Sequence, residues 1–258
     1  MRFAPMAQVS CCSAQAMVYF YFMQYTQFHG HTIAADSRAA YLAHLQKLLQ
    51  SNACTQVVTI NPEYIVLAHS QAKLKALTLP PNLAIPDGVG LTWALTYRGK
   101  HVERYPGVDM VLDLCAHAKQ HNLSVGVLAA QHGLSSSSEI QAALQQRFPG
   151  LSVVVRTEND PHPDQAFRDA NARILFVTFG QPRQDVWIAE HVQAMPTLRI
   201  AMGVGGAFDF LTGKRQRAPR LMQRLGVEWL WRLVTQPQRL PRMLRATFGF
   251  WYVILTTK

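Results

Sequence analysis

The chain has 258 residues, of which 49% are hydrophobic and only 16% are charged. This length and apolar content suit one large domain, or a domain with an appendage, and exclude a disordered, collagen-like or low-complexity protein. The formal net charge is +10, and ten of the 25 Lys and Arg residues lie between residues 212 and 258 together with a single acid, Glu228. We therefore expect a nearly neutral body followed by a strongly basic tail.

The N-terminal residues do not favour a secretory signal. The run MVYFYFMQYTQF at residues 17–28 is apolar and aromatic, but glutamines interrupt it and only Arg2 precedes it. A signal peptide has a stronger basic start and an unbroken apolar stretch, so a peripheral extension, or a start codon placed too far upstream, is the better interpretation. No stretch of 18 or more residues is continuously apolar, so a membrane-spanning helix is not expected.

The cysteine and histidine spacings favour neither disulfides nor zinc. No CxxC pair occurs, and four cysteines are few for a disulfide framework in a chain of this length. We expect a cytoplasmic protein with reduced thiols, and these are Cys11, Cys12, Cys54 and Cys115. The ten histidines show no H-x₃₋₅-H or HExxH spacing, so no metal ligands are predicted.

From Thr32 onward, strand-like and helix-like segments alternate. Ser37 caps a predicted helix over residues 39–49, the β-branched run TQVVTI predicts a buried strand, and Asn61-Pro62-Glu63 opens a further helix. A short apolar segment lies at 83–86. Later strands are predicted at 123–129, 151–155, 173–179 and 198–202, and helices at 111–121, 139–147, 166–172 and 185–193. This order predicts an α/β fold, a Rossmann-like parallel sheet with helices on both faces, whose ligands bind beyond the carboxyl ends of the strands.

We divide the chain into three parts. Residues 1–31 are an N-terminal extension, peripheral or poorly ordered, residues 32–211 are the α/β core, and residues 212–258 are a basic helical C-terminal appendage. The appendage ends on ATFGFWYVIL, which is too short to cross a bilayer. Arginine mixed with Trp, Phe and Leu is typical of a segment at the interface of an anionic membrane, although nucleic-acid binding and an ordinary core helix use similar residues. Ten consecutive apolar residues favour lipid over nucleic acid.

Polar residues and glycines follow several of the predicted strands. Asp87, in IPDGVG, is either a turn or capping residue or a carboxylate at a strand end that acts as a general base. The loop GQPRQ at 180–184 carries two amides and a cation, which suit a sugar or uracil as well as an ordinary solvated loop. The glycines within 203–206 either form a turn with positive φ or let N–H groups approach a diphosphate. Phe208 stands where a dinucleotide-binding motif needs its third glycine, which disfavours a dehydrogenase.

Absent motifs exclude further enzyme classes. The chain has no GxxxxGK[ST] loop and no GxSxG nucleophile elbow. No Asp-x-Asp pair occurs either, which removes the usual metal site for a nucleotide-sugar diphosphate. Arginines, lysines and backbone N–H groups would then have to stabilise such a diphosphate.

Five blocks in this order resemble the WecG/TagA/CpsF family of bacterial glycosyltransferases, glycosyltransferase family 26. They are VVTINPEYIVLA (57–68), IPDGVGLTWA (85–94), VERYPGVDMV (102–111), FVTFGQPRQDVWIAEH (176–191) and AMGVGGAFDFLTGKRQRAPRLMQRLGVEWLWRL (201–233). The resemblance covers about residues 32–245. It implies an inverting, metal-independent enzyme without a cofactor. Such an enzyme moves N-acetylmannosamine, its uronic acid or a related hexose from a UDP-sugar to a polyprenyl-diphosphate-linked saccharide in surface polysaccharide or teichoic acid synthesis.

The resemblance also implies roles for single residues. Asp87 would be the catalytic base that deprotonates the acceptor hydroxyl, and Arg104 and Gln184 would contact substrate. The family's appendage covers the site, supplies arginines to the diphosphate and touches the membrane. The other candidate substrate-binding residues are Thr59, Asn61, Gly203, Gly205, Gly206, Asp209, Arg232, Arg239 and Arg242.

The expected partners are a UDP-sugar, the lipid-linked acceptor and the anionic inner face of the cell membrane. The protein would be cytoplasmic and peripheral on that membrane, with a second copy of the chain as a further option and without nucleic acid. The alternative function is a non-catalytic nucleotide-binding or membrane-adaptor protein of the same fold. The presence of Asp87 and Gln184 favours the enzyme.

Overall fold

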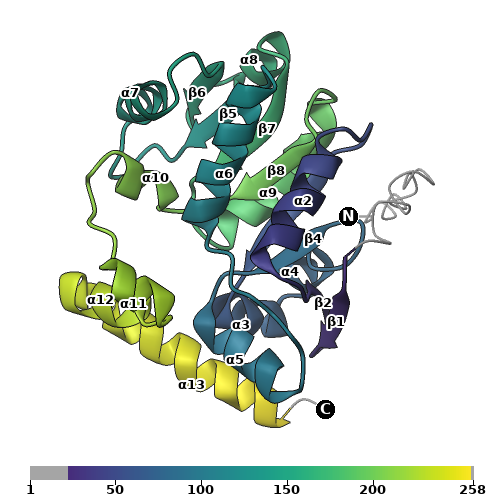
Figure 1. Cartoon of the computed structure of the whole chain (residues 1–258), viewed down its shortest axis with the longest axis vertical. Helices are drawn as coiled ribbons and strands as arrows, with labels where there is room; N and C mark the ends of the chain where they lie inside the picture. Colours follow the sequence, from purple (N-terminus) through teal and green to yellow (C-terminus); the bar gives the residue numbers. More distant parts are fainter. Residues whose placement is uncertain (1–22, 257–258) are drawn as a thin grey trace, which may run out of the picture.

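The computed structural model describes residues 23–256 as an eight-stranded sheet between layers of helices (Figure 1). The strand order is β1-β2-β4-β3-β8-β7-β5-β6. The strands are β1 (Tyr25–Phe28), β2 (His31–Ala34), β3 (Thr55–Ile60), β4 (Leu83–Pro86), β5 (Ser124–Ala129), β6 (Val153–Thr157), β7 (Ala172–Val177) and β8 (Ile200–Gly203). All pairings between these described strands are parallel except that of β1 with β2. The predicted α/β class is confirmed, and an antiparallel edge strand is added to it.

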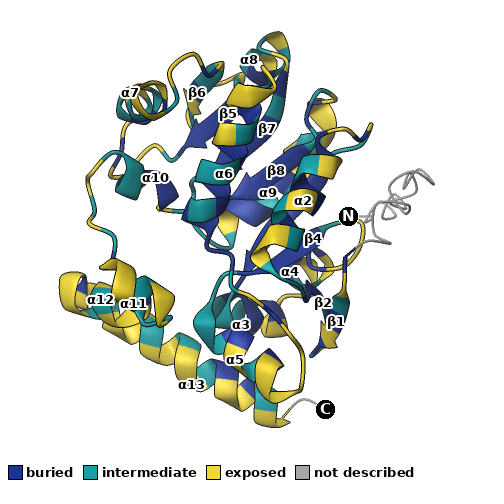
Figure 2. Cartoon of the chain, in the orientation of Figure 1, coloured by how far each residue is buried: buried dark blue, intermediate teal, exposed yellow. Residues whose placement is uncertain are grey.

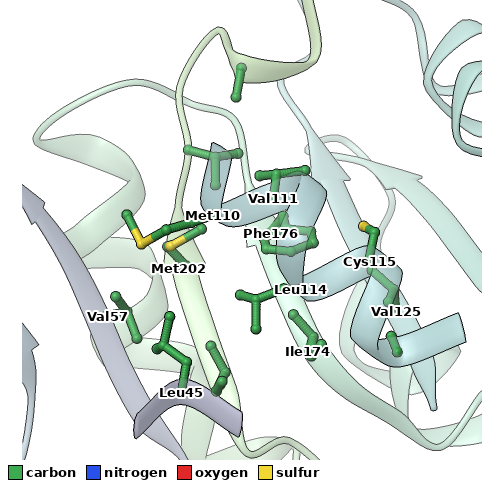
Figure 3. Close-up of a cluster of buried hydrophobic side chains, with 14 of the residues drawn as sticks. Leu45, Val57, Met110, Val111, Leu114, Cys115, Val125, Ile174, Phe176 and Met202 are labelled. Carbon is green, nitrogen blue, oxygen red and sulfur yellow. The ribbon is translucent and has the colours of Figure 1, made fainter. Parts of the chain in front are cut away.

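Helices cover both faces of the sheet, because alternate strand residues point to opposite sides. In β3, Val57 belongs to one buried cluster and Val58 to another. The first face is covered by α2 (Arg38–Leu48), α6 (Gly107–Gln120), α7 (Ser137–Arg147) and α10 (Ala207–Leu211). The second is covered by α3 (Pro62–Ser70), α4 (Ala72–Ala76), α5 (Val89–Tyr97), α8 (Pro163–Asp169), α9 (Arg183–His191) and α13 (Leu240–Thr256). Figure 3 shows part of the first cluster, where Leu45 and Leu114 lie among side chains of the strands.

The local signals that start the helices are present in the structure. Ser37 accepts a hydrogen bond from the Ala40 N–H, and Asn61 accepts one from the Tyr64 N–H at 2.9 Å. Two predicted helices are displaced along the chain. The helix expected at 111–121 begins at Gly107, because Pro106 has an extended conformation suited to the residue before a helix. The helix expected at 166–172 begins at Pro163 and ends before Asn171, whose positive φ terminates it.

The hairpin of β1 and β2 crosses the boundary that we expected at residue 31. His29 and Gly30, with φ of +48° and +78°, form its turn, and Phe28 at the end of β1 is fully buried. The Phe28 ring stacks on Phe250 of α13 with centroids 6.2 Å apart. Residues 25–31 are therefore part of the sheet, since pairing with β2 and packing against the last described helix hold them there. Residues 1–22 of the predicted extension lie outside the described residues.

Two of the four cysteines can be placed. Cys54 and Cys115 are free thiols, and burial raises the pKa of each to about 12. A thiol with so high a pKa carries almost no thiolate near neutral pH and is a poor nucleophile. Cys11 and Cys12 lie outside the described residues.

Candidate active site

The basic C-terminal appendage lies beside α3 and α5, the helices that follow strands β3 and β4 (Figure 1). After α10 the chain continues through α11 (Arg220–Arg224) and α12 (Glu228–Thr235) to α13. α13 packs along α3, where a Cβ at Gly249 would lie 3.0 Å from Val66, so that the glycine permits close contact. The turn between α11 and α12 rests on the start of α5, because a Cβ at Gly226 would lie 2.8 Å from Val89.

Asp87 lies where the appendage meets the core. It follows β4 directly, its N–H donates to the Ile60 carbonyl at 2.9 Å, and its carboxylate accepts a hydrogen bond from the Gly107 N–H at the start of α6. Burial raises the pKa of the Asp87 carboxyl, while the positive charges of Arg232 and Arg104 act in the opposite direction. A carboxylate with a raised pKa is a stronger base than one in water, which suits the predicted proton acceptor.

Thr59 and Asn61 lie next to Asp87, as the prediction of one common site requires. A Cβ at Gly88 would lie 2.6 Å from Pro62 and 2.8 Å from Asn61, so glycine is needed for the loop after β4 to approach α3. The Gln181 amide connects this region to α9. Its Nε2 donates to the Thr59 carbonyl at 2.7 Å, and its Oε1 accepts from Asn61 Nδ2 at 2.9 Å. The sequence had indicated the loop containing Gln181, but not this linking role.

Gln184 supports the glycine loop at residues 203–206. Its side chain is 1% exposed, and its Oε1 accepts hydrogen bonds from the N–H groups of Gly180 at 3.0 Å and Gly205 at 2.9 Å. A Cβ at Gly203 would lie 2.4 Å from Gln184 Nε2, so a larger residue there would displace the Gln184 side chain. The Val204 N–H donates to the Val177 carbonyl. Two N–H groups that we expected to face a diphosphate are therefore already bonded within the protein.

Asp209 and Arg215 lie on the other side of the glycine loop. Asp209 Oδ1 accepts from Ser135 Oγ at 2.9 Å, and Asp209 Oδ2 is 3.6 Å from Arg215 Nε. A Cβ at Gly206 would lie 2.9 Å from Asp209 Oδ2 and 3.6 Å from Arg215 Nη1. A cavity of about 50 Å³ is lined here by Ser135, Thr178, Gly206 and their neighbours. A larger groove of about 450 Å³ lies at the edge strand β6, separated from β4 by four strands.

An arginine cluster lies between the glycine loop and the start of α3; it consists of Arg215, Arg232, Arg239 and Arg242. Burial and the positive charges of the other three hold the pKa of Arg239 below its usual range. Arg242 pairs with Glu63, and the Arg232 guanidinium lies 5.7 Å from the centre of the Phe210 ring. Four guanidinium groups against the carboxylates of Glu63 and Asp209 leave an excess of positive charge, which suits a diphosphate.

The predicted substrate contact Arg104 lies close enough to Asp87 for its charge to lower the pKa of that carboxyl, and it also pairs with Glu228. Its Nη2 lies 2.6 Å from Glu228 Oε2, and both side chains are mostly buried. Sequence reasoning missed Glu228 and Arg215 as parts of the site. Glu228 did carry a signal, as the single acid among residues 212–258.

Much of the appendage is exposed (Figure 2), and many of its exposed side chains are large and apolar. Its exposed large side chains include Leu221, Leu225, Trp229, Leu230, Val234, Leu240, Leu244, Phe248, Trp251, Tyr252 and Leu255. Within residues 23–256, no helix combines the length and hydropathy that crossing a membrane requires. In the same part of the chain, no three His, Cys, Asp or Glu side chains are grouped as metal ligands would be.

Comparisons with known proteins identify a family and a relative. The model of the glycosyl transferase WecG/TagA/CpsF family matches residues 26–258, so the match includes most of the β1–β2 hairpin. A curated relative from Bacillus spizizenii is an N-acetylglucosaminyldiphosphoundecaprenol N-acetyl-beta-D-mannosaminyltransferase. It is 29% identical over 212 residues, which cover 80% of this chain and 81% of the relative.

Proposed function

The chain belongs to the WecG/TagA/CpsF glycosyltransferase family, and we propose that it transfers N-acetylmannosamine from UDP to N-acetylglucosamine on a polyprenyl diphosphate. The name of the Bacillus spizizenii relative supports this sugar and this acceptor. The observation that carries the proposal is the position of Asp87, a carboxylate of raised pKa within reach of the charge of Arg232 from the arginine cluster. A base and a cationic site for a leaving diphosphate are what glycosyl transfer needs.

The proposed reaction proceeds by direct displacement. Asp87 takes the proton of the acceptor hydroxyl while the hydroxyl oxygen attacks C1 of the donor sugar. The bond between C1 and the diphosphate oxygen breaks, UDP leaves on the opposite side, and the configuration at C1 inverts. The arginine cluster meets the negative charge that grows on the diphosphate, a task that the N–H groups of Val204 and Gly205 do not share. In this proposal the arginines replace a metal ion.

The appendage supports a place at the membrane. Arginines next to exposed Trp, Phe and Leu side chains suit the interface of an anionic bilayer, with the apolar groups among the acyl chains and the cations at the headgroups. We infer that the protein binds peripherally to the inner face of the membrane through this surface. The arginine cluster and Asp87 would then lie close to the lipid-linked diphosphate.

Replacing Asp87 tests the chemistry. Asp87→Asn keeps the size of the side chain but removes the base, so we expect kcat to fall by at least about 100-fold while UDP-sugar binding persists. Transfer from a panel of UDP-sugars to a lipid-diphosphate acceptor is followed by mass spectrometry, with and without EDTA. Asp160→Asn, at the β6 edge, is the matched control and should keep full activity.

Three results would contradict the proposal. Wild-type turnover in Asp87→Asn would remove Asp87 as the base. Loss of transfer in EDTA, restored by a divalent cation, would refute metal independence. Failure of the wild-type chain to use any UDP-sugar of the panel would refute the proposal that the donor is a UDP-sugar.

A further inference from the structure

Glu228 is buried between one arginine of the core and one of the appendage. Its Oε2 lies 2.6 Å from Arg104 Nη2, and its Oε1 lies 3.4 Å from Arg217 Nε. The exposed fractions of these side chains are 11% for Glu228, 19% for Arg104 and 24% for Arg217. Ion pairs so far from water are screened little by salt and depend on both partners being present.

The same ion pairs continue into the core. Arg217 Nη1 lies 2.5 Å from Asp109 Oδ1, and Arg38 binds Asp109 at 3.3 Å and Asp113 at 2.8 Å. A continuous series of charges therefore runs from α12 through the first turn of α6 to α2. The first residue of α6 is Gly107, whose N–H donates to the Asp87 carboxylate.

Glu228 also lies close to the proposed base. Gly226, two residues before it, has a φ of +72° and packs on Val89, two residues after Asp87. The negative charge of Glu228 is close enough to raise the pKa of Asp87, against the effect of Arg104. Glu228 of the appendage thus lies close to both Asp87 and Arg104.

We propose that Glu228 is a positioning residue that fastens the appendage to the core and keeps Arg104 beside Asp87. This inference rests on the proposed function for its catalytic consequence, but not for the docking itself. Without the Glu228 carboxylate, the partly buried guanidinium groups of Arg104 and Arg217 lie near each other with less counter-charge. Their repulsion favours movement of the appendage, with its arginine cluster, away from Asp87.

Glu228→Gln tests the catalytic consequence. We expect kcat to fall about 10- to 100-fold and KM for the UDP-sugar to rise about tenfold, because both the base and the diphosphate site are misplaced. Glu228→Asp should restore part of the activity.

Lys214→Met is the matched control. Lys214 also joins the appendage to the core, through an ion pair of 2.6 Å with Glu139, but both side chains are more than 40% exposed. Exposed pairs contribute little, so this variant should stay within about twofold of wild type. An equal loss of activity in Lys214→Met would overturn the special role of Glu228.

Amide hydrogen exchange measures the docking without substrate. In Glu228→Gln we expect faster exchange over residues 220–235 and unchanged exchange in β3. Unchanged exchange and kinetics in this variant would refute the proposal, and so would general acceleration that includes β3. If exchange changes as expected but the wild type transfers no sugar, the docking stands and the proposed function fails.

Discussion

Asp185 provides a stability test that follows directly from its surroundings. It lies in α9 next to Gln184 and is fully buried, and no other described residue donates a hydrogen bond to its carboxylate. Burial raises the pKa of Asp185 from 3.8 to about 7. Asp185→Asn removes the ionisation while keeping the shape of the side chain.

The size of the effect follows from the two pKa values. Between pH 4 and pH 7 the folded protein keeps a proton on Asp185 that the unfolded chain releases, so the free energy of unfolding falls by about 1.4 kcal/mol per pH unit. Over about three units this amounts to about 4 kcal/mol, which is an upper limit because the interior rearranges around a buried charge. The contribution is fully present below pH 4 and is lost as the pH rises through 7.

Urea unfolding of wild type and Asp185→Asn at half-unit steps from pH 4 to pH 8 measures this difference. The wild type should lose stability relative to the variant as the pH rises, by at least about 1.4 kcal/mol overall. The other titrating groups contribute equally to the free energy of unfolding of both proteins, so their contributions cancel in the comparison. Asp169→Asn, an exposed acid on α8, serves as the control and should run parallel to wild type. Parallel curves for Asp185→Asn would refute the raised pKa.

Three further predictions concern the appendage. Arg239→Met should raise KM for the UDP-sugar about 10- to 100-fold in steady-state kinetics, because hydrogen bonds to charged groups contribute about 1.5–3 kcal/mol. Arg220→Met, at an exposed site on α11, is the control. An equal rise of KM in Arg220→Met would contradict a specific diphosphate site. Phe250→Ala should lower the free energy of unfolding by about 3–5 kcal/mol, since the ring is 3% exposed and stacks on Phe28. The Phe248 side chain is 70% exposed, so Phe248→Ala should leave the free energy of unfolding unchanged. The same variant should bind anionic vesicles more weakly in a sedimentation assay. An unchanged affinity for the vesicles would show that Phe248 is not part of the membrane-binding surface.

The alternation of strands and helices was visible in the sequence because buried parallel strands are short β-branched runs. TQVVTI forms β3 with the predicted bounds, and the capping residues Ser37 and Asn61 mark true helix starts. The β1–β2 hairpin was not predictable in the same way. Its strands have only four residues each and mix polar with apolar side chains, and β1 is stabilised by Phe250 from the other end of the chain.

The candidate site was only partly predictable from the sequence, for a similar reason. Position after a strand made Asp87 and the loop of Gln184 candidates, since parallel strands bring their carboxyl ends to one edge. The sequence could not show that Gln184 is used to hold Gly205, nor that Arg104 meets Glu228. Such contacts join residues far apart in the chain, and no local pattern encodes them.

The contact between Phe28 and Phe250 has a consequence for the order of events during protein synthesis. The ribosome releases β1 early and α13 late, so the sheet forms while one side of Phe28 still lacks its covering helix. Asp87 is then already next to Asn61, but the arginines of the appendage have yet to arrive. Under the proposed function, a nascent chain therefore carries the base without the diphosphate site until α13 has docked.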